Sequence, residues 1–421
     1  MERPELQTLY SLLDHVKACI ALYEATYSDR ARLQAYETSV KLTRALEDPK
    51  NAVFKLFLSL TRQPTQAMAV KIAHDLGLFA ILAASDVAVS CKELADRSGA
   101  HPLLVERIMR VLVAMAFAQE HSGRKYCATL LSKEMVGKKS AIVDTLFVDI
   151  APAILKTPKI LRETNYQNPE TPCAGPIQHT YGTPLATFDW LAENKPIQQR
   201  FHAYVEAVRA GQPYWVDWFP VQERILHDCC CGPDDPLIVD LAAGRGGDMW
   251  AFKRKFPDAT GRVIIQDLPA VFQDVYGQDL GLERIEHDIF DPQPIIGKST
   301  NFISCVANMG QELISHHAGA RVYYLRWILH EFSDDGCRRI LQGLTQVMRK
   351  GHSKILIEEF ILPDENAGLF PSMVDMLLMV FGPGIARTEG RWRTMLTSVG
   401  LRVNLVAHAN GEGPSIIEAE L

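Results

Sequence analysis

From residue 236 onward, short apolar runs alternate with longer segments that have helical periodicity. Each apolar run has the length of one β-strand, and each segment between runs can carry the chain back to the same end of a sheet. This alternation predicts an α/β fold with βαβ units and a mostly parallel sheet. The last two runs, 401–408 and 415–421, are further predicted strands.

The first strand of this region ends in a turn rich in small residues. Its sequence reads Asp240-Leu-Ala242-Ala-Gly244-Arg-Gly246 and leads into a helical pattern. Glycine lets the backbone approach a ligand closely and permits positive φ. A dinucleotide site would have the spacing G-x-G-x-x-G. Here Ala242 occupies the first small position, so the turn alone is a weak signal of nucleotide binding.

Two acidic residues strengthen that signal because each follows a further predicted strand. Asp267 ends the strand 261–267, about 20 residues past the turn, where a carboxylate can accept hydrogen bonds from a ribose diol. Asp288 ends the short run 285–290 and is placed to meet an adenine amino group. Either acid alone could be a loop residue or a helix cap. Together with the glycine turn, they predict a nucleoside site at the carboxyl ends of the strands.

A histidine ends another predicted strand. Residues 323–330 form an apolar and aromatic run that stops at His330, and the next run, 354–359, ends in Glu358 and Glu359. Ligands bind at the carboxyl ends of strands in open α/β sheets, so His330 is a candidate general base. The alternative is a structural histidine. Because side chains alternate along a strand, only one of the two glutamates can face His330.

The amino-terminal part of the chain is predicted to be helical. Residues 1–60 have an amphipathic pattern, and 64–135 read as a helix over 66–82, two more helices and a hairpin, which is the winged-helix layout. A DNA reader needs polar side chains early in its recognition helix. That helix begins here with Leu103, Leu104 and Val105. We therefore expect it to pack against protein, and a winged-helix regulator is the weaker alternative.

The middle of the chain is predicted to contain a long loop and two helices. Residues 156–183 are rich in Pro, Thr, Asn and Gly, whereas 184–193 and 195–210 have helical patterns. Aromatic residues between 201 and 219 could line an apolar pocket or pack in an ordinary core. We expect a helical domain over 1–220 and an α/β domain over 221–421.

Length and composition exclude several classes of protein. A chain of 421 residues is too long for one ordinary core, and a net charge of −6 argues against nonspecific nucleic-acid binding. The nine cysteines contain no CxxC pair, so no zinc or other metal site is predicted and the thiols are expected to be reduced. No apolar stretch reaches membrane-spanning length, and no signal peptide is recognisable. A cytoplasmic protein without a membrane partner is expected.

These motifs together resemble those of class I S-adenosylmethionine-dependent O-methyltransferases of the caffeic-acid O-methyltransferase type, close to the fungal members that act in secondary metabolism. The resemblance covers residues 60–421. The family pattern is V-D-x-G-G-G-x-G, then D-L-P, then D-x-F, then K/R-W-x-x-H-D/E-W/F-S-D. The matching segments here are Val239-Asp240-Leu-Ala-Ala-Gly244-Arg-Gly246, Asp267-Leu-Pro269, Asp288-Ile-Phe290 and Arg326-Trp-Ile-Leu-His330-Glu-Phe-Ser-Asp334.

The resemblance implies a Rossmann-like methyltransferase domain that binds S-adenosylmethionine. Its mostly parallel sheet would have seven strands, with 401–408 and 415–421 as an antiparallel hairpin at one edge. The resemblance also implies a homodimer formed through the winged-helix-like region. It also implies a role for each matching residue. Gly244 and Gly246 would face the methionine part, and Asp267 would bind the ribose. The remaining positions implied for the cofactor are Asp288, Ile289 and Phe290 around the adenine, and Arg326 at the family's Lys/Arg position.

The resemblance further implies a catalytic set. His330 would be the general base, and Glu359 matches a family glutamate that precedes x-I-L-P, so we expect Glu359 to orient His330. A second family glutamate precedes Arg-Thr, but Ala386 stands at that place. Glu389 could take over this role from one helical turn later, or it could be only an early-helix charge.

The expected reaction is methyl transfer to a hydroxyl of an aromatic or polyketide-like small molecule. The pocket would draw on the aromatics of 201–219 and on the apolar residues Met373, Met376, Met379 and Phe381, since methionine-rich walls adapt to many planar ligands. The alternative is a protein that binds the cofactor but does not methylate. Such a protein would steer cyclisation or decarboxylation, or act as a partner subunit.

Residues 298–319 interrupt a connection that is short in the family. Gly297-Lys-Ser can be encoded by a typical intron start, and Ala-Gly319 by a typical intron end. Removal of 298–319 in frame would join Gly297 to Ala320. We hypothesise a retained intron or an error in the gene model. The alternative is a genuine surface loop.

Overall fold

A computed structural model describes residues 6–137, 140–209, 212–227, 229, 231–273, 281–295, 319–409 and 413–421. The chain divides into two compact units. The first comprises Met1–Pro152 and Asn194–Gly211, and the second comprises Ala153–Glu193 and Gln212–Leu421. The domain boundary that the sequence predicts at residue 220 stays a prediction.

The first unit is mainly helical, as expected. It begins with α1 (Leu6–Thr26), α2 (Asp29–Leu46) and α3 (Pro49–Asp75). The helix predicted over 66–82 is instead divided between α3 and α4 (Leu78–Ala83). Gly77 between them has φ +65°, a left-handed conformation that ends one helix and that glycine adopts at little cost.

The winged-helix-like part contains α5 (Cys91–Ser98), α6 (Pro102–Ala114) and a small sheet of order β1-β3-β2. Its strands are β1 (Val89–Ser90), β2 (Ala118–His121) and β3 (Lys125–Ala128). Val105 of α6 is fully buried, as predicted, but Leu103 and Leu104 are 55% and 41% exposed. The first turn of α6 therefore presents apolar side chains on the surface of this chain. This unit also contains the helices α7 (Leu130–Glu134), α8 (Ala141–Asp144), η2 (Thr145–Ile150) and α12 (Lys195–Arg209).

The loop predicted over 156–183 is shorter than expected. Helix α9 (Ala151–Glu163) runs into it, and α10 (Pro176–Tyr181) forms within it. Pro176 starts α10 because the first position of a helix needs no backbone N–H. The Gln178 side chain also accepts the Gly175 N–H at 3.0 Å and so satisfies the helix start. The prolines and glycines of this segment therefore mark the ends of helices as well as loop.

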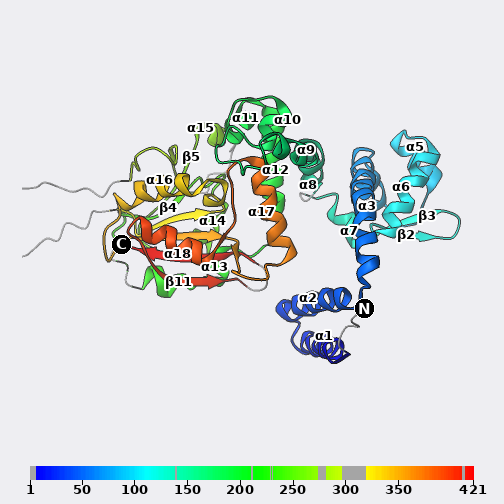
Figure 1. The fold of residues 1–421 in the computed structure, drawn as a ribbon, viewed down its shortest axis with the longest axis horizontal. Coiled ribbons are helices and arrows are strands. Elements are labelled where there is room, and N and C mark those ends of the chain that lie inside the picture. The colour runs from blue at the N-terminus through cyan, green and yellow to red at the C-terminus, as the bar shows by residue number, and fades with distance from the viewer. Residues whose placement is uncertain are drawn as a thin grey trace, which may run out of the picture. The chain divides into compact units, whose positions relative to one another are not determined.

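The second unit contains a seven-stranded sheet, shown in Figure 1 with α14, α16 and α18 packed beside it. The strand order is β11-β12-β8-β7-β4-β5-β6, and all pairs are parallel except the two that involve β12. This is the mostly parallel sheet with an antiparallel edge hairpin that the sequence predicts. The strands are β4 (Pro236–Leu241), β5 (Arg262–Asp267), β6 (Glu283–Glu286), β7 (Val322–Arg326), β8 (Lys354–Glu359), β11 (Arg402–His408) and β12 (Ser415–Glu420).

Each face of the sheet packs against its own set of helices. Ile355 and Ile357 of β8 share one core with α16 (Asp334–Thr345) and α18 (Glu389–Ser398). Leu356, which points the other way, shares a second core with α13 (Trp215–Trp218) and α14 (Gly247–Lys255). The same alternation continues to the end of β8, so Glu358 and Glu359 project on opposite faces of the sheet.

The two sides of the segment 298–319 lie close together. The Tyr323 hydroxyl donates to the Ile295 carbonyl at 3.2 Å and accepts the Ala320 N–H at 3.1 Å, so these backbone atoms lie within roughly 6 Å of each other. Two residues of extended chain span about 7 Å, which is enough to close this gap.

The retained-intron hypothesis falls mostly outside the described residues, of which only Gly319 belongs to 298–319. Gly319 has φ +69°, and a Cβ there would lie 2.4 Å from the Val347 carbonyl oxygen. The position before Ala320 therefore requires glycine. Removal of 298–319 would place Gly297 at that position, so the shortened chain also meets the requirement.

Candidate active site

The turn after β4 combines three residues with positive φ, namely Ala242 at 52°, Gly244 at 59° and Gly246 at 74°. A Cβ on Gly246 would lie 3.0 Å from Leu282 Cδ1, so this glycine is required by packing inside the protein. A Cβ on Gly244 would meet nothing within 4 Å. The backbone at Gly244 therefore borders open space, as a backbone that approaches a ligand must.

Asp267 at the end of β5 lies against this turn. Its Oδ2 accepts the Gly244 N–H at 2.7 Å, and its Oδ1 accepts the Leu268 N–H at 2.7 Å. Burial raises the pKa of Asp267 to about 6, although these two backbone donors oppose the shift. The two hydrogen bonds fix the Asp267 carboxylate at the carboxyl end of β5. Its remaining lone pairs can accept hydrogen bonds from a diol.

Asp288 is exposed and follows the carboxyl end of β6, the strand next to β5. Its Oδ1 accepts the Phe290 N–H at 2.9 Å, which shapes the Asp288-Ile289-Phe290 turn. Ile289 packs partly buried against the sheet core. Phe290 is 37% exposed and lies edge-on to Phe332, with ring centroids 5.1 Å apart. The turn thus presents an apolar surface beside a carboxylate.

Arg326 ends β7 and is nearly enclosed, with 12% of its side chain exposed. Its Nε lies 3.4 Å from Glu358 Oε1 and 3.7 Å from Asp248 Oδ2, and its guanidinium stacks 3.7 Å from the centre of the Trp327 ring. In the described part of the chain, the buried Arg326 Nη2 and Trp327 Nε1 have no hydrogen-bond partner. A buried donor without a protein partner is free to bind an acceptor from water or a ligand.

Two carboxylates, those of Asp248 and Glu358, lie against Arg326. Burial raises the pKa of the nearby Asp240 well above its usual range, which favours its neutral form. The two carboxylates fit the cationic ammonium and sulfonium groups of S-adenosylmethionine, and the buried donors Arg326 Nη2 and Trp327 Nε1 fit its carboxylate and other acceptors. The residues present fit the cofactor that the sequence implies.

His330 does not continue the strand that the sequence predicts over 323–330. Strand β7 ends at Arg326, because Trp327 adopts φ +55°, which breaks the extended conformation. His330 lies in the following 3₁₀ turn, η4 (Leu329–Glu331). It nevertheless remains at the carboxyl end of β7, next to the end of β8.

Carboxylates approach both ring nitrogens of His330. Nδ1 lies 2.6 Å from Glu359 Oε2, and Nε2 lies 3.4 Å from Glu331 Oε1. Glu359 also accepts the backbone N–H of His330 at 3.2 Å. Burial alone lowers the pKa of His330, but the charge of Glu359 and the bond from Glu331 outweigh it and raise the pKa to about 10. The structure thus brings Glu359, and not Glu358, to His330.

A buried arginine that the sequence reasoning missed holds the turn around His330. The fully buried Arg387 donates to the Leu329 carbonyl at 3.1 Å, to the Phe332 carbonyl at 2.8 Å and to Asp334 Oδ1 at 2.8 Å. The two carbonyls flank the histidine in the chain. The sequence contained a sign of this role, because Arg387 belongs to the Arg-Thr pair that follows the second family glutamate.

Ala386, where the family has glutamate, is 7% exposed and donates its N–H to Asp375 Oδ1 at 2.7 Å. Asp375 belongs to α17 (Leu369–Phe381), so a carboxylate from another element reaches this position. Glu389 begins α18 and pairs with Arg393 at 2.6 Å with 40% of its side chain exposed. Glu389 therefore has the setting of an early-helix charge.

Apolar residues of α17 form an exposed surface in this chain. Met373 and Met376 are 59% and 58% exposed. The aromatics between 201 and 219 are not one group. Trp215 is fully buried, stacked 5.0 Å from Tyr324, and Phe219 lies in the same core. These two pack in the sheet core and do not line a substrate pocket.

Comparisons with known proteins identify the family of this chain. The family model of the O-methyltransferase dimerisation domain matches residues 60–138, and that of the O-methyltransferase domain matches 234–402. The O-methyltransferase penC of Penicillium thymicola is 32% identical over 392 residues, which are 93% of this chain and 91% of penC. The chain belongs to the O-methyltransferase family. It is therefore a fungal-type O-methyltransferase, and S-adenosylmethionine is its cofactor.

Solved structures show the same fold over nearly the whole chain. LepI in complex with SAM superposes with a TM-score of 0.82 at 23% identity, covering 99% of both chains. OxaC in complex with SAH and oxaline superposes with a TM-score of 0.78 at 22% identity, covering 98% of this chain and 99% of OxaC. Within the described residues of this O-methyltransferase, no helix is long and apolar enough to cross a membrane.

Proposed function

We propose that this O-methyltransferase transfers a methyl group to a hydroxyl of an aromatic or polyketide-like small molecule in secondary metabolism. The observation that carries the proposal is the pairing of His330 Nδ1 with Glu359 Oε2 at 2.6 Å, at the carboxyl ends of β7 and β8. A histidine held in this way by a buried carboxylate has the arrangement of a general base. The proposed site lies within the second unit.

The proposed cofactor contacts come from successive strand ends. Gly244 gives the backbone access to the methionine part, while Gly246 keeps the turn packed against Leu282 and Ile265. Asp267 accepts hydrogen bonds from the ribose hydroxyls, and Arg326 Nη2 donates to an acceptor of the cofactor. When bound, S-adenosylmethionine supplies a methyl group on a positively charged sulfur, which leaves as a neutral thioether. The turn of Asp288, Ile289 and Phe290 would hold the adenine, with the carboxylate accepting from its amino group.

His330 takes the proton from the acceptor hydroxyl in this proposal. A phenol has a pKa near 10 and is mostly protonated at pH 7, so a base within hydrogen-bond reach contributes roughly 10²–10⁴-fold. Glu359 holds Nδ1–H and stabilises the imidazolium that forms, which leaves Nε2 for the hydroxyl. Glu331 must then yield its contact with Nε2 to the acceptor, because both compete for the same nitrogen.

Against the effect of burial, Glu359 and Glu331 raise the pKa of His330 to about 10 in the free protein. This pKa leaves His330 mostly protonated at pH 7 before the acceptor binds. Activity should accordingly rise with pH.

A second function is favoured by one observation. Ala386 stands where the family has a glutamate. The nearby Asp375 carboxylate accepts the Ala386 backbone N–H. A protein that binds S-adenosylmethionine without methylating, and steers cyclisation or decarboxylation, would tolerate that loss. The homodimer is proposed from the dimerisation domain over 60–138.

The first experiment is a calorimetric titration of the full chain with S-adenosylhomocysteine, followed by methyl transfer from labelled S-adenosylmethionine to a panel of phenols. We expect binding in the wild-type chain, loss of binding in Asp267→Ala, and label in at least one phenol. The matched control is Asp335→Ala, since the Asp335 side chain is 91% exposed and outside the proposed cofactor contacts. Cofactor binding without transfer to any phenol would favour the second function. Equal affinity in Asp267→Ala and wild type would contradict the proposed cofactor site.

A further inference from the structure

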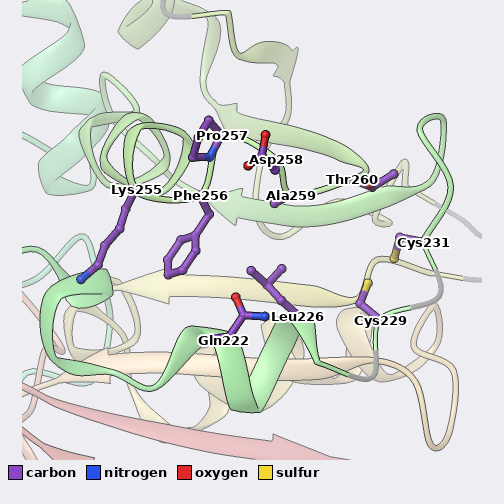
Figure 2. Close-up of a pocket in the computed structure, with 10 residues that line it drawn as sticks. All are labelled: Gln222, Leu226, Cys229, Cys231, Lys255, Phe256, Pro257, Asp258, Ala259 and Thr260. Atoms are coloured by element: carbon purple, nitrogen blue, oxygen red, sulfur yellow. The ribbon is translucent and has the colours of Figure 1, made fainter.

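A pocket lies away from the proposed active site, at the opposite ends of the strands. Figure 2 shows its lining, which comes from η3 (Gln222–Leu226), from residues 255–260 between α14 and β5, and from Cys229 and Cys231. Its volume is about 410 Å³. Because these segments precede β4 and β5, the pocket borders the amino ends of the strands whose carboxyl ends carry the proposed cofactor residues.

Two thiols face each other in this pocket. Figure 2 shows the sulfur atoms of Cys229 and Cys231 turned towards one another, and both residues are free cysteines that are only partly buried. Cys231 lies close to the start of β5, because a Cβ on Gly261 would lie 3.5 Å from Cys231 Cβ. Both cysteines line the pocket, so molecules that enter it can reach their thiols.

The surroundings shift the pKa values of the two thiols in opposite directions. The hydrogen bond from the Cys231 thiol lowers the pKa of Cys229 to about 6 against the effect of burial, and the Arg321 guanidinium contributes to the lowering. Donation of that bond, together with burial, raises the pKa of Cys231 above its usual range. Because the thiolate is the reactive form of cysteine, Cys229 would attack first and Cys231 would follow.

Other cysteines of the chain have a different setting. Burial raises the pKa of Cys337 to about 12, and its thiol donates to the Leu329 carbonyl. Burial also raises the pKa of Cys91. Such thiols are inert structural residues. Cys173 is a single exposed thiol and serves as an internal reference.

We propose that Cys229 and Cys231 form a redox-active dithiol that reacts with low-molecular-weight disulfides of the glutathione class. The Cys229 thiolate attacks one sulfur of the disulfide, forms a mixed disulfide and releases one thiolate. Cys231, on losing its proton to solvent, then attacks the Cys229 sulfur and releases the second thiolate. The protein is oxidised by two electrons to the Cys229–Cys231 disulfide, and the small disulfide is reduced to two thiols.

This reaction does not depend on methyl transfer. The dithiol borders the amino ends of β4 and β5, whereas Gly244 and Asp267 lie at the carboxyl ends. Oxidation should therefore leave the affinity for S-adenosylhomocysteine within about twofold. Failure of the cofactor site would therefore appear as lost S-adenosylhomocysteine affinity. Failure of the dithiol would appear separately, as lost thiol reactivity.

The first test measures alkylation rates of the full chain by mass spectrometry after digestion. The lowered pKa of Cys229 increases its thiolate fraction at pH 6. After allowing for the lower nucleophilicity of a thiolate with low pKa, we expect Cys229 to react about tenfold faster than Cys173. Cys230 separates the pair in the sequence and lies outside the described residues, so the chain is measured with and without Cys230→Ser. Equal rates at Cys229 and Cys173 would overturn the proposal.

The second test exposes the protein to glutathione disulfide and weighs the products. We expect the intact chain to lose two hydrogen atoms, with the Cys229–Cys231 bond found in a peptide, and Cys231→Ser to stop at the mixed disulfide on Cys229. Cys173→Ser is the control and should behave like the intact chain. A mixed disulfide that persists while Cys231 is present would contradict the assignment of Cys231. If Cys229→Ser forms the mixed disulfide as fast as wild type, the nucleophile is another cysteine and the proposal fails.

Discussion

The backbone N–H of Ile385 donates to the backbone carbonyl of His330 at 2.8 Å. The chain next to it is equally close, because a Cβ on Gly384 would lie 2.8 Å from the same carbonyl oxygen. Together with Arg387, these contacts pin the turn of the proposed base to the segment before α18. The geometry of His330 is therefore set by residues far away in the sequence as much as by its own strand.

This arrangement predicts that Arg387→Lys impairs catalysis more than cofactor binding. Lysine keeps a positive charge near Asp334 but cannot donate simultaneously to the Leu329 and Phe332 carbonyls. We expect kcat to fall about tenfold or more and stability to fall by about 2–4 kcal/mol, while the Kd for S-adenosylhomocysteine stays within about threefold.

Arg391→Lys is the matched control, since Arg391 contacts the same Asp334 at 3.2 Å but is 49% exposed. It should leave both kcat and stability nearly unchanged. A normal kcat in folded Arg387→Lys would show that the buried arginine does not position His330.

Glu331→Gln should shift the pH dependence of methyl transfer to lower pH. The Glu331 carboxylate helps to raise the pKa of His330 to about 10, so its neutralisation lowers that pKa. The base must be neutral to act, so kcat/KM of the wild type should rise with pH towards about 10. In Glu331→Gln the rise should end roughly one pH unit lower.

The ionisation of the acceptor is the same in both enzymes, so the difference between their profiles reports on His330. Asp335→Asn, which removes an exposed carboxylate near the same turn, is the control and should follow the wild-type profile. Identical pH profiles of kcat/KM for Glu331→Gln and wild type would show that Glu331 does not influence the pKa of His330.

Gly244→Ala and Gly246→Ala should fail in different ways. A methyl group at residue 244 enters open space, so we expect a stability loss of about 1–2 kcal/mol from its positive φ and a large loss of S-adenosylhomocysteine affinity. At residue 246 it meets Leu282 and Ile265, so folding itself should suffer more. The control is Gly247→Ala, whose Cβ meets nothing and whose φ is ordinary. Unchanged affinity in Gly244→Ala, measured by calorimetry, would remove the turn from the cofactor site.

Deletion of 298–319 should leave a folded chain. The Ile295 carbonyl and the Ala320 N–H meet at one tyrosine hydroxyl, and Gly297 would supply the glycine required before Ala320. We expect the shortened protein to keep its affinity for S-adenosylhomocysteine and a Tm at least equal to that of the full chain. Aggregation of the shortened protein would favour a genuine loop, and the major transcript decides the origin of the segment.

Local patterns predicted the mostly parallel sheet, and the family resemblance implied its edge hairpin and the pairing of Glu359 with His330. The local patterns succeed because strand periodicity and the positions of strand ends are properties of short segments. Sequence patterns did not predict the break at Trp327 or the split between α3 and α4, because each depends on one residue with positive φ. The long-range contacts of Arg387 and the facing thiols of Cys229 and Cys231 arise only on folding, so no local pattern reveals them.

The most direct test of the proposed mechanism is single-turnover methyl transfer by His330→Ala to a phenol that the wild type accepts, with S-adenosylhomocysteine affinity measured on the same preparation. The account predicts a rate lower by about 10²–10⁴-fold and an unchanged Kd. Glu359→Gln should fall in the same direction with the same Kd, because Gln cannot stabilise the imidazolium. A rate in His330→Ala within a few-fold of wild type, at unchanged Kd, would contradict the assignment of His330 as the base.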